Sequence, residues 1–270
     1  MHIGAGDPMI LVKLGGSVIT DKARLRTFRK ETCQRLAREL SPVADGLILV
    51  HGAGSFGHIV AKEHRLHEGF KAESQLAHVA GVQRDVRELD LMVIGALIDG
   101  GIRAVSVPPM ASALFASGKV KSFKADPFRS MVDLGLTPVT FGDVVPDESM
   151  GFSICSGDLM MYELARHFRP SITIFCADVD GVYDSDPKSD PDADLMPRLD
   201  RATLDSMRHS EPLTADVTGS IFGKLDRMLD IASYCEKCMI LNGNVAGRLG
   251  KAVSGDEVVC TEVLSGQVCS

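Results

Sequence analysis

Short, continuously apolar segments that run into glycines alternate with amphipathic segments along this chain. Residues 9–13 (MILVK) and 46–50 (GLILV) are the first two apolar segments, and each leads into a loop rich in glycine. Between them, residues 33–40 place apolar side chains at positions i, i+3, i+4 and i+7, the spacing of one helix face. A buried strand, a helix and a second buried strand within about forty residues form a βαβ unit, the building block of a parallel sheet.

The alternation continues beyond these two strands. Apolar residues recur every three or four positions over residues 79–93, which predicts a long helix ended by Gly100 and Gly101. Further strands are predicted at residues 102–107, 137–141, 152–155, 171–176, 238–242 and 258–263. We therefore predict an α/β fold with an open, mostly parallel sheet, helices on both faces, and ligand sites at the carboxyl ends of the strands.

Charge and composition exclude several classes of partner. The chain carries 29 Lys and Arg against 36 Asp and Glu, a net charge of −7, so we expect no nucleic acid and no anionic membrane as partner. The longest apolar stretch, residues 91–98, is far shorter than the ~20 residues of a membrane-spanning helix. Seven irregularly spaced cysteines, including the Cys235–Cys238 pair, favour reduced packing residues over disulfides. We expect a soluble, cytoplasmic protein.

The loop after the first strand has the composition of a phosphate site. Lys13 supplies a cation at the end of the strand, and the bare backbones of Gly15 and Gly16 can approach an anion closely. Lys22 follows within reach of the same loop. An ordinary turn with a surface lysine is the alternative interpretation, and this loop alone does not decide between them.

The loop after the second strand, residues 51–58 (HGAGSFGH), allows three interpretations. The pattern G-x-G-x-x-G is typical of a dinucleotide site, which needs an acid about twenty residues further on; Glu73 has the distance but sits in a polar helical stretch. Ser55 resembles a hydrolase nucleophile, although Ala53 replaces the usual first glycine. The third interpretation is a glycine-rich anion cradle with His58 as a hydrogen-bond donor. It is the only one of the three that uses this loop together with the loop after the first strand.

Two further segments bring acids and a lysine to the predicted strand ends. Asp178, Asp180 and Tyr183 follow the strand at 171–176 and are suited to a ribose and a base, or merely to solvent. Residues 219–224 read G-x-x-x-G-K, one residue short of a P-loop, which places Lys224 at a predicted helix start.

No metal site made of protein side chains is expected. His64 and His67 lack an obvious third ligand. The acidic loop 184–197 lacks the glycine and the bidentate glutamate of a calcium-binding EF-hand.

Taken in order, the segments VKLGGSVITDK, HGAGSFGH, FGDVV, SGD, ADVDGVY and DVTG…GK resemble the amino acid kinase superfamily and, within it, the isopentenyl phosphate kinase family, from about residue 9 to residue 262. The resemblance implies an open αβα sandwich with one continuous sheet. It implies an acceptor-binding lobe over 1–170, a nucleotide-binding lobe over 171–270, and a homodimer. The implied reaction is ATP- and Mg²⁺-dependent phosphorylation of isopentenyl phosphate to isopentenyl diphosphate in isoprenoid biosynthesis.

The resemblance also implies roles for individual residues. Those implied to bind ATP are Lys13, Gly15, Gly16, Ser17, Gly54, Asp178, Asp180, Gly181, Tyr183, Gly219 and Lys224. Those implied to bind the acceptor are Ala53, Gly54, His58 and Gly157. Those implied to act in catalysis are Lys13, Lys22, His58, Asp158 and Lys224, with Asp158 orienting the lysines.

The implied chemistry needs cations and no general base, because a phosphate monoester is already ionised near neutral pH. Kinases of other small acceptors, such as fosfomycin, share the scaffold, and a nucleotide sensor without turnover is a third possibility. The presence of Lys13, Lys22 and Lys224 together argues against a sensor, because a sensor does not need charges that stabilise a transition state. The stripe Val79, Val82 and Val86 is a candidate wall for an apolar acceptor tail, and plain core or dimer contact is the alternative.

Overall fold

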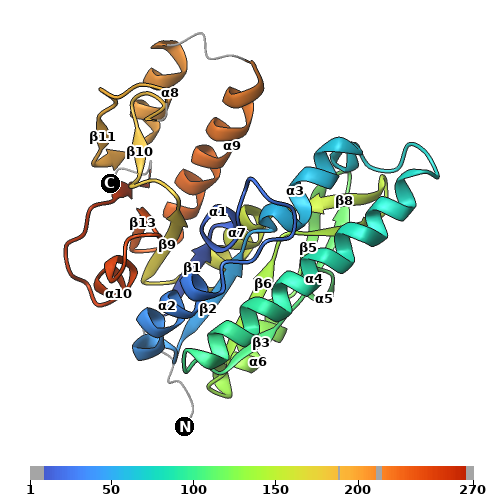
Figure 1. The fold of residues 1–270 in the computed structure, drawn as a ribbon, viewed down its shortest axis with the longest axis horizontal. Helices are drawn as coiled ribbons and strands as arrows, with labels where there is room; N and C mark the ends of the chain where they lie inside the picture. The colour runs from blue at the N-terminus through green and yellow to red at the C-terminus, as the bar shows by residue number, and fades with distance from the viewer. Residues whose placement is uncertain (1–8, 188, 211–214, 266–270) are drawn as a thin grey trace.

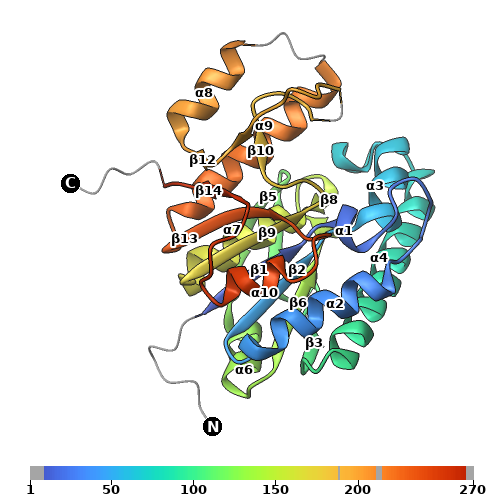
Figure 2. The same cartoon turned by 60° about the vertical axis from the view of Figure 1, so that its left-hand side comes forward.

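In the computed structural model of the chain, residues 9–187, 189–210 and 215–265 are described, without the side chains of residues 209–220. An eight-stranded sheet forms the centre, in the order β12-β14-β13-β9-β1-β2-β6-β3 (Figure 1, Figure 2). All neighbouring strands are parallel except β13 and β14. The strands are β1 (Ile10–Leu14), β2 (Leu47–His51), β3 (Ala104–Ser106), β6 (Thr137–Phe141), β9 (Ile172–Ala177), β12 (Arg198–Leu199), β13 (Lys237–Asn242) and β14 (Thr261–Val263). The predicted α/β fold with a mostly parallel sheet is confirmed.

Helices cover both faces of this sheet, which gives three layers (Figure 1, Figure 2). Because side chains alternate along a strand, Val12 and Leu14 of β1 pack toward α2, α4 and α10, whereas Leu11 packs toward α6, α7 and α9. The helices are α1 (Gly16–Ile19), α2 (Lys30–Leu40), α3 (Gly54–Glu63), α4 (Gln75–Asp99), α5 (Pro109–Ser112), α6 (Asp126–Asp133), α7 (Gly157–Phe168), α8 (Arg201–Ser210), α9 (Ala215–Ala232) and α10 (Arg248–Val253), with 3-10 turns η1 (Ser41–Val43) and η2 (Leu66–Glu68).

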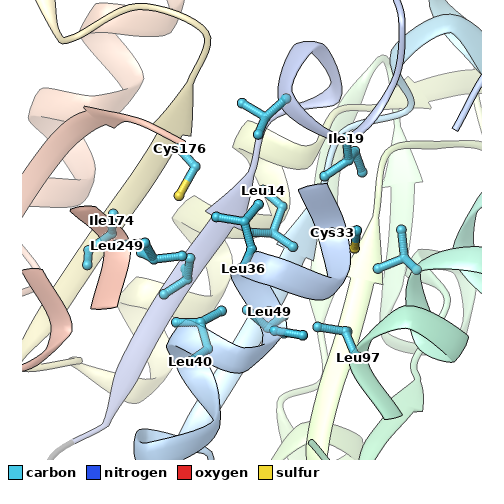
Figure 3. Close-up of a cluster of buried hydrophobic side chains, with 14 of the residues drawn as sticks. Leu14, Ile19, Cys33, Leu36, Leu40, Leu49, Leu97, Ile174, Cys176 and Leu249 are labelled. Carbon is cyan, nitrogen blue, oxygen red and sulfur yellow. The ribbon is translucent and has the colours of Figure 1, made fainter. Parts of the chain in front are cut away.

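The core between the sheet and α2 shows why the apolar spacing of residues 33–40 is sufficient to form this helix. Leu36 of α2 lies over Leu14 of β1 and Leu49 of β2, with Leu249 of α10 nearby (Figure 3). All these side chains are completely or almost completely buried. Full burial of each leucine stabilises the fold by roughly 1.5–3 kcal/mol before the loss of conformational entropy is counted.

One part of the predicted strand pattern forms a separate sheet. The segment 152–155 belongs to β8 (Gly151–Cys155), which pairs antiparallel with β7 (Asp143–Asp147). This sheet has the order β5-β4-β7-β8 and is completed by β4 (Ala113–Ala116) and β5 (Lys119–Phe123), which the sequence analysis missed. A last small pair joins β10 (Val182–Tyr183) to β11 (Leu195–Met196). The expectation that 152–155 continues the regular sheet and helix alternation is therefore wrong, because a tight turn reverses the chain after Asp147.

The register of the parallel strands brings several loop starts to one edge. Leu14 at the end of β1 pairs with His51 of β2 and with Cys176 of β9. His51 in turn pairs with Phe141 at the end of β6. The loops that follow β1, β2, β6 and β9 therefore leave the sheet side by side, where a ligand site is expected in this class of fold.

The expectations about membranes and cysteines can be compared with the described residues. None of the helices described there is long and apolar enough to cross a bilayer. The six cysteines among them are free, and burial raises the pKa of the Cys33 thiol to about 12, which keeps it protonated. Cys235 follows α9, where its Sγ donates to the Ile231 carbonyl, and Cys238 is buried in β13.

Asp147 fixes the end of β7, the strand whose first residues reach the candidate site. Its carboxylate accepts four backbone N–H bonds, from Ser117, Gly118, Ser149 and Met150, at 2.8–3.0 Å. Burial acts to raise the pKa of Asp147, but these four bonds outweigh it and hold the pKa at about 2. Asp147 is thus a carboxylate that stabilises two turns at once.

Asp147→Asn is expected to lower the free energy of unfolding by about 1–3 kcal/mol near pH 7, since an amide cannot accept all four bonds. The folded-state pKa lies below the unfolded value, so the carboxylate's contribution is complete above about pH 4 and is lost as the pH falls toward 2. Urea unfolding from pH 7 to pH 3 measures the difference between the two proteins, which should shrink in acid. Asp133→Asn, at an exposed position of α6, is the control; a constant difference would contradict the assignment.

Candidate active site

A cavity of about 750 Å³ opens at the carboxyl edge of the parallel strands. Its wall comes from the loops after β1, β2, β6, β8 and β9 together with parts of α3, α4 and α9. The predicted site residues that line it are Lys13, Gly15, Gly16, Ser17, Lys22, Ala53, Gly54, His58, Gly157, Asp158, Asp178, Gly181, Tyr183 and Lys224. Segments from both halves of the sequence thus converge on one cavity.

Glycines allow two loops to touch backbone to backbone: the loop after β1, called the first loop, and the loop after β2, called the second loop. A Cβ on Gly16 would lie 2.6 Å from both Cα and N of Gly54, and a Cβ on Gly52 would lie 2.6 Å from N of Gly16. Gly54 also has a φ of +48°, a conformation that other residues rarely adopt. Gly16 begins α1 and Gly54 begins α3, so the backbone N–H groups of two helix starts border the same cavity.

The local geometry decides among the three interpretations of residues 51–58. Ser55 is 3% exposed and its Oγ accepts a bond from the Thr27 N–H at 3.4 Å. No histidine among the described residues is hydrogen-bonded to this Oγ, so the hydrolase interpretation is wrong. Glu73 lies in the exposed turn before α4 and not at a strand end, which removes the acid that a dinucleotide site requires. The anion cradle is the interpretation that fits.

Lys13 is held in the cavity by a carboxylate from the other side of the site. Its Nζ forms an ion pair with Asp158 in the first turn of α7, and both side chains are largely buried. The Lys13 ammonium also lies 5.9 Å from the centre of the Phe175 ring. Ser156 caps α7 by accepting the Leu159 N–H, which fixes the helix start that carries Asp158.

Asp178 connects the first loop to Lys22. Its Oδ1 accepts from Ser17 Oγ at 2.8 Å, and its Oδ2 accepts from Lys22 Nζ at 3.0 Å. Partial burial acts to raise the pKa of Asp178, but the bonds from Ser17 and Lys22 lower it below its usual value. Lys22 itself remains 60% exposed, so its ammonium stays hydrated while the carboxylate restrains it.

His58 lies on α3 and lines the cavity next to the lysines. Desolvation by the surrounding protein lowers the pKa of His58, and the positive charges of Lys224, Lys13 and Lys22 lower it further, against a smaller opposing effect of Asp158. The ring is therefore neutral near pH 7 and carries one N–H that can donate to an anion. An anion bound here would meet several positive charges and one neutral donor.

The loop after β9 differs from the expectation in one residue, Asp180. Asp180 does not line the cavity; its Oδ1 accepts from Arg248 Nη1 at 2.5 Å and from Asn242 Nδ2 at 3.1 Å. Arg248 was missed by the sequence analysis, since it belongs to no motif and lies far along the chain. A Cβ on Gly181 would lie 2.3 Å from Thr261 Oγ1, so this glycine is required by close packing.

The segment that carries the last lysine also differs from the expectation. Lys224 lines the cavity, but it lies inside α9, which begins at Ala215, and not at a helix start. The predicted start at residue 223 is therefore wrong, and Lys224 cannot act together with a helix N-terminus. Gly219 lies within α9 but outside the residues whose burial and contacts the structure describes.

An apolar wall adjoins His58. Val82 and Val86 of α4 line the cavity, and both pack against Gly57, the residue before His58. Val79 does not line it, although it packs against the same apolar cluster that contains Val82 and Val86. Ile59, Val144 and Ile154 complete this side. Only part of the predicted valine stripe thus borders the cavity, because Val79 lies about two turns before Val86 along α4, beyond the cavity wall.

Comparisons with known proteins agree with this geometry. The model of the Amino acid kinase family matches residues 8–242, so the chain belongs to the amino acid kinase family. Isopentenyl phosphate kinase of Thermoplasma acidophilum is 38% identical over 90% of this chain and 95% of its own length. The enzyme of that name from Methanothermobacter thermautotrophicus is 35% identical over 94% of this chain and 98% of its own.

Solved structures of known proteins are also similar to this chain. One described as X-ray structures of isopentenyl phosphate kinase has a TM-score of 0.82 and 33% identity, and covers 94% of this chain and 99% of its own. UMP kinase from Ureaplasma parvum, with a TM-score of 0.65 and 15% identity, shares the fold. The expected amino acid kinase fold is confirmed.

Gly16→Ala is expected to lower the free energy of unfolding by about 1–3 kcal/mol, because the new methyl group meets the Gly54 backbone and must force the loops apart. Gly81→Ala on α4 is the matched control: no atom lies within 4 Å of its Cβ, and the better helix former should stabilise by up to about 1 kcal/mol. Denaturant unfolding measures both. Equal stability of the two variants would contradict the close contact of the loops.

Proposed function

We propose that this chain transfers the terminal phosphoryl group of ATP to isopentenyl phosphate and so forms isopentenyl diphosphate and ADP for isoprenoid biosynthesis. The observation that carries the proposal is the surroundings of His58. Its ring shares one cavity with three lysines, and Val82 and Val86 line the same cavity. A small acceptor with an anionic head and an apolar tail matches this combination, and the high similarity to curated isopentenyl phosphate kinases supports the same acceptor.

The acceptor's phosphate is proposed to lie over the second loop. The backbone around Ala53 and Gly54, the N–H of the neutral His58 ring, and the start of α7 at Gly157 would surround it. Backbone N–H groups at helix starts are suited to phosphate oxygens. The apolar tail would then point along Val82 and Val86, where it makes no hydrogen bond.

The phosphates of ATP are proposed to lie over the first loop. Lys13, Gly15, Gly16, Ser17 and Lys224 would line them, and the Asp158 ion pair supports Lys13 in that position. Lys22 would stand near the transferred group, restrained by Asp178. Gly219 is also proposed beside the ATP phosphates. The residues proposed beside the nucleoside are Asp178, Asp180, Gly181 and Tyr183, and for Asp180 the contact with Arg248 favours an indirect role.

The reaction follows from these positions. An ionised oxygen of the acceptor phosphate attacks the γ-phosphorus of ATP, the bond from that phosphorus to the β-γ bridging oxygen breaks, and ADP leaves with the electron pair. No proton has to be removed, so no general base is needed. Lys13, Lys22 and Lys224 would reduce the repulsion between the two anions and stabilise charge on the transferred group.

Magnesium is proposed to arrive with ATP. In the described part of the chain, no three His, Cys, Asp or Glu side chains gather into a metal site. The two carboxylates nearest the lysines, Asp158 and Asp178, are already paired with them. The phosphate oxygens of ATP would therefore supply most ligands of the ion, which would add to the neutralisation of charge there.

Three further features belong to the proposal. We propose an acceptor-binding lobe over 1–170 and a nucleotide-binding lobe over 171–270, joined by the continuous sheet. A homodimer is supported by the family resemblance and by the exposed Leu91 and Ile98 on α4. The family resemblance, the acidic net charge and the irregular cysteines support a cytoplasmic location.

An acceptor panel tests the proposed function. The purified chain is incubated with ATP and Mg²⁺ and, separately, with isopentenyl phosphate, dimethylallyl phosphate, geranyl phosphate or fosfomycin, and products are identified by mass spectrometry. We expect addition of one phosphoryl group to the two five-carbon phosphates. Preferred turnover of fosfomycin would move the assignment to a kinase of that acceptor, and nucleotide binding without any product would indicate a sensor.

His58→Ala is expected to lower kcat/KM for isopentenyl phosphate by roughly ten- to a hundredfold, the worth of one hydrogen bond to a charged group. The Kd of ATP should not change, because His58 lies outside the first loop. Steady-state kinetics and calorimetry measure the two effects. His64→Ala, just beyond the end of α3 and outside the cavity lining, is the matched control. An unchanged kcat/KM in His58→Ala would remove this residue from the acceptor site.

Trimming the apolar wall should relax selection against long tails. We expect geranyl phosphate to be a poorer acceptor than isopentenyl phosphate, and Val82→Ala to narrow this gap by about tenfold, since it removes bulk from the wall. Val79→Ala, which changes the same residue type on the same helix away from the cavity, should leave the ratio unchanged. The measurement is the ratio of kcat/KM for isopentenyl phosphate to kcat/KM for geranyl phosphate in the unmodified protein and in each variant. Equal values for the two acceptors in the unmodified protein would contradict a closed pocket.

A further inference from the structure

Thr20 is a buried residue that the proposed mechanism does not use. It follows α1 and is completely buried. Its Oγ1 donates to the Gly16 carbonyl at 2.6 Å and accepts the Ser55 N–H at 3.1 Å. Gly16 belongs to the first loop, whereas Ser55 lies in the first turn of α3, in the second loop. One hydroxyl group therefore joins the two loops.

The contact around this hydroxyl is tight. A Cβ on Gly54 would lie 2.2 Å from Thr20 Oγ1 and 2.8 Å from its methyl carbon. The Ser55 N–H is one of the helix-start donors that have no partner within the helix, so Thr20 Oγ1 supplies its acceptor. Loss of the hydroxyl would leave a buried donor without that acceptor, and the loops would have to move to restore one.

Thr20 also begins the loop that carries Lys22. Thr20 and Phe28 form an isolated antiparallel bridge, and the Asp21 N–H donates to the Thr27 carbonyl at 2.9 Å. Ser55 accepts from this loop as well, its carbonyl from the Arg26 N–H at 3.3 Å and its Oγ from the Thr27 N–H at 3.4 Å. The position of Lys22 is thus fixed relative to α3 through Thr20 and Ser55.

The far end of this loop is attached to α4. Arg26 forms ion pairs with Asp85 and Glu88. The loop is consequently held at its base by the Thr20 hydroxyl and at its far end by side-chain charges. Of these two attachments, the base contact is the one that touches both glycine loops, so it acts together with their backbone contact on the separation of the two sites.

We propose that Thr20 is a positioning residue whose hydroxyl sets the distance between the donor and acceptor phosphates and the place of Lys22 between them. This inference rests on the proposed phosphoryl transfer. Each loop can bind its own phosphate without the link, because the N–H groups that line each loop belong to that loop. Transfer, in contrast, needs the attacking oxygen within about 3–3.5 Å of the phosphorus, and a displacement of about 1 Å can cost a hundredfold in rate.

Thr20→Val and Thr20→Ser test the inference as a pair. Valine keeps the shape and removes the hydroxyl, whereas serine keeps the hydroxyl. We expect Thr20→Val to lower kcat by roughly ten- to a hundredfold while the separate Kd values of ATP and isopentenyl phosphate stay within about threefold. Thr20→Ser should recover most of kcat. A merely structural role would not produce a loss confined to kcat in folded protein.

Thr137→Val is the matched control. Thr137 is also buried, and its Oγ1 donates to the Ala44 carbonyl at 3.2 Å, but it starts β6 at the opposite end of the sheet. This variant should change stability and leave kcat unchanged. Thr20→Ala, which removes the hydroxyl without adding bulk, replaces Thr20→Val if the valine variant does not fold.

The outcomes separate this inference from the proposed function. Wild-type protein that does not phosphorylate isopentenyl phosphate would refute the function. Active wild type with an unchanged kcat in both hydroxyl-free variants would overturn the role of Thr20. A rise in one Kd with unchanged kcat would also overturn it, because it would assign the hydroxyl to binding at a single loop.

Discussion

The backbone contact between the two glycine loops is the constraint on which the rest of the site depends. Gly16, Gly52 and Gly54 approach so closely that a single added carbon would lie 2.6 Å or less from a neighbouring atom. Such contact is possible only without side chains, and it places two helix starts next to each other at one edge of the sheet. In the proposed reaction, this arrangement brings the two phosphate sites within reach of direct transfer.

The charges of the site reduce the repulsion between two phosphates that would be bound side by side. Two anions side by side repel each other, yet the protein as a whole carries a net charge of −7. Positive charge is therefore local: Lys13 and Lys22 are each held by one carboxylate, Asp158 and Asp178. The carboxylates restrain the lysines, and in the proposed reaction the phosphates of ATP and the acceptor would supply the additional negative charge. His58 contributes a neutral donor because desolvation, and then the positive charges of Lys224, Lys13 and Lys22, lower its pKa.

The sequence predicts those parts of the molecule that depend on local pattern. Buried parallel strands such as residues 46–50 and the stripe over 33–40 were found because each has its own periodicity and ends in glycine. The cavity residues Lys13, Gly16 and Lys224 were found because each belongs to a short motif that contains glycine. The helix start at residue 223 was wrong, since α9 begins earlier without a strong signal. The pairs Asp180–Arg248 and Thr20–Ser55 depend on contacts between distant segments, which no local pattern contains.

Direct transfer between the two loops is the central claim, and the stereochemistry at phosphorus tests it most directly. ATP made chiral at the γ-phosphorus with three oxygen isotopes is used to phosphorylate isopentenyl phosphate, and the configuration of the new terminal phosphoryl group is determined by ³¹P NMR. A single in-line displacement predicts inversion of configuration. Retention would require two displacements through a phosphorylated side chain, and it would contradict an account in which the loops hold both phosphates at once.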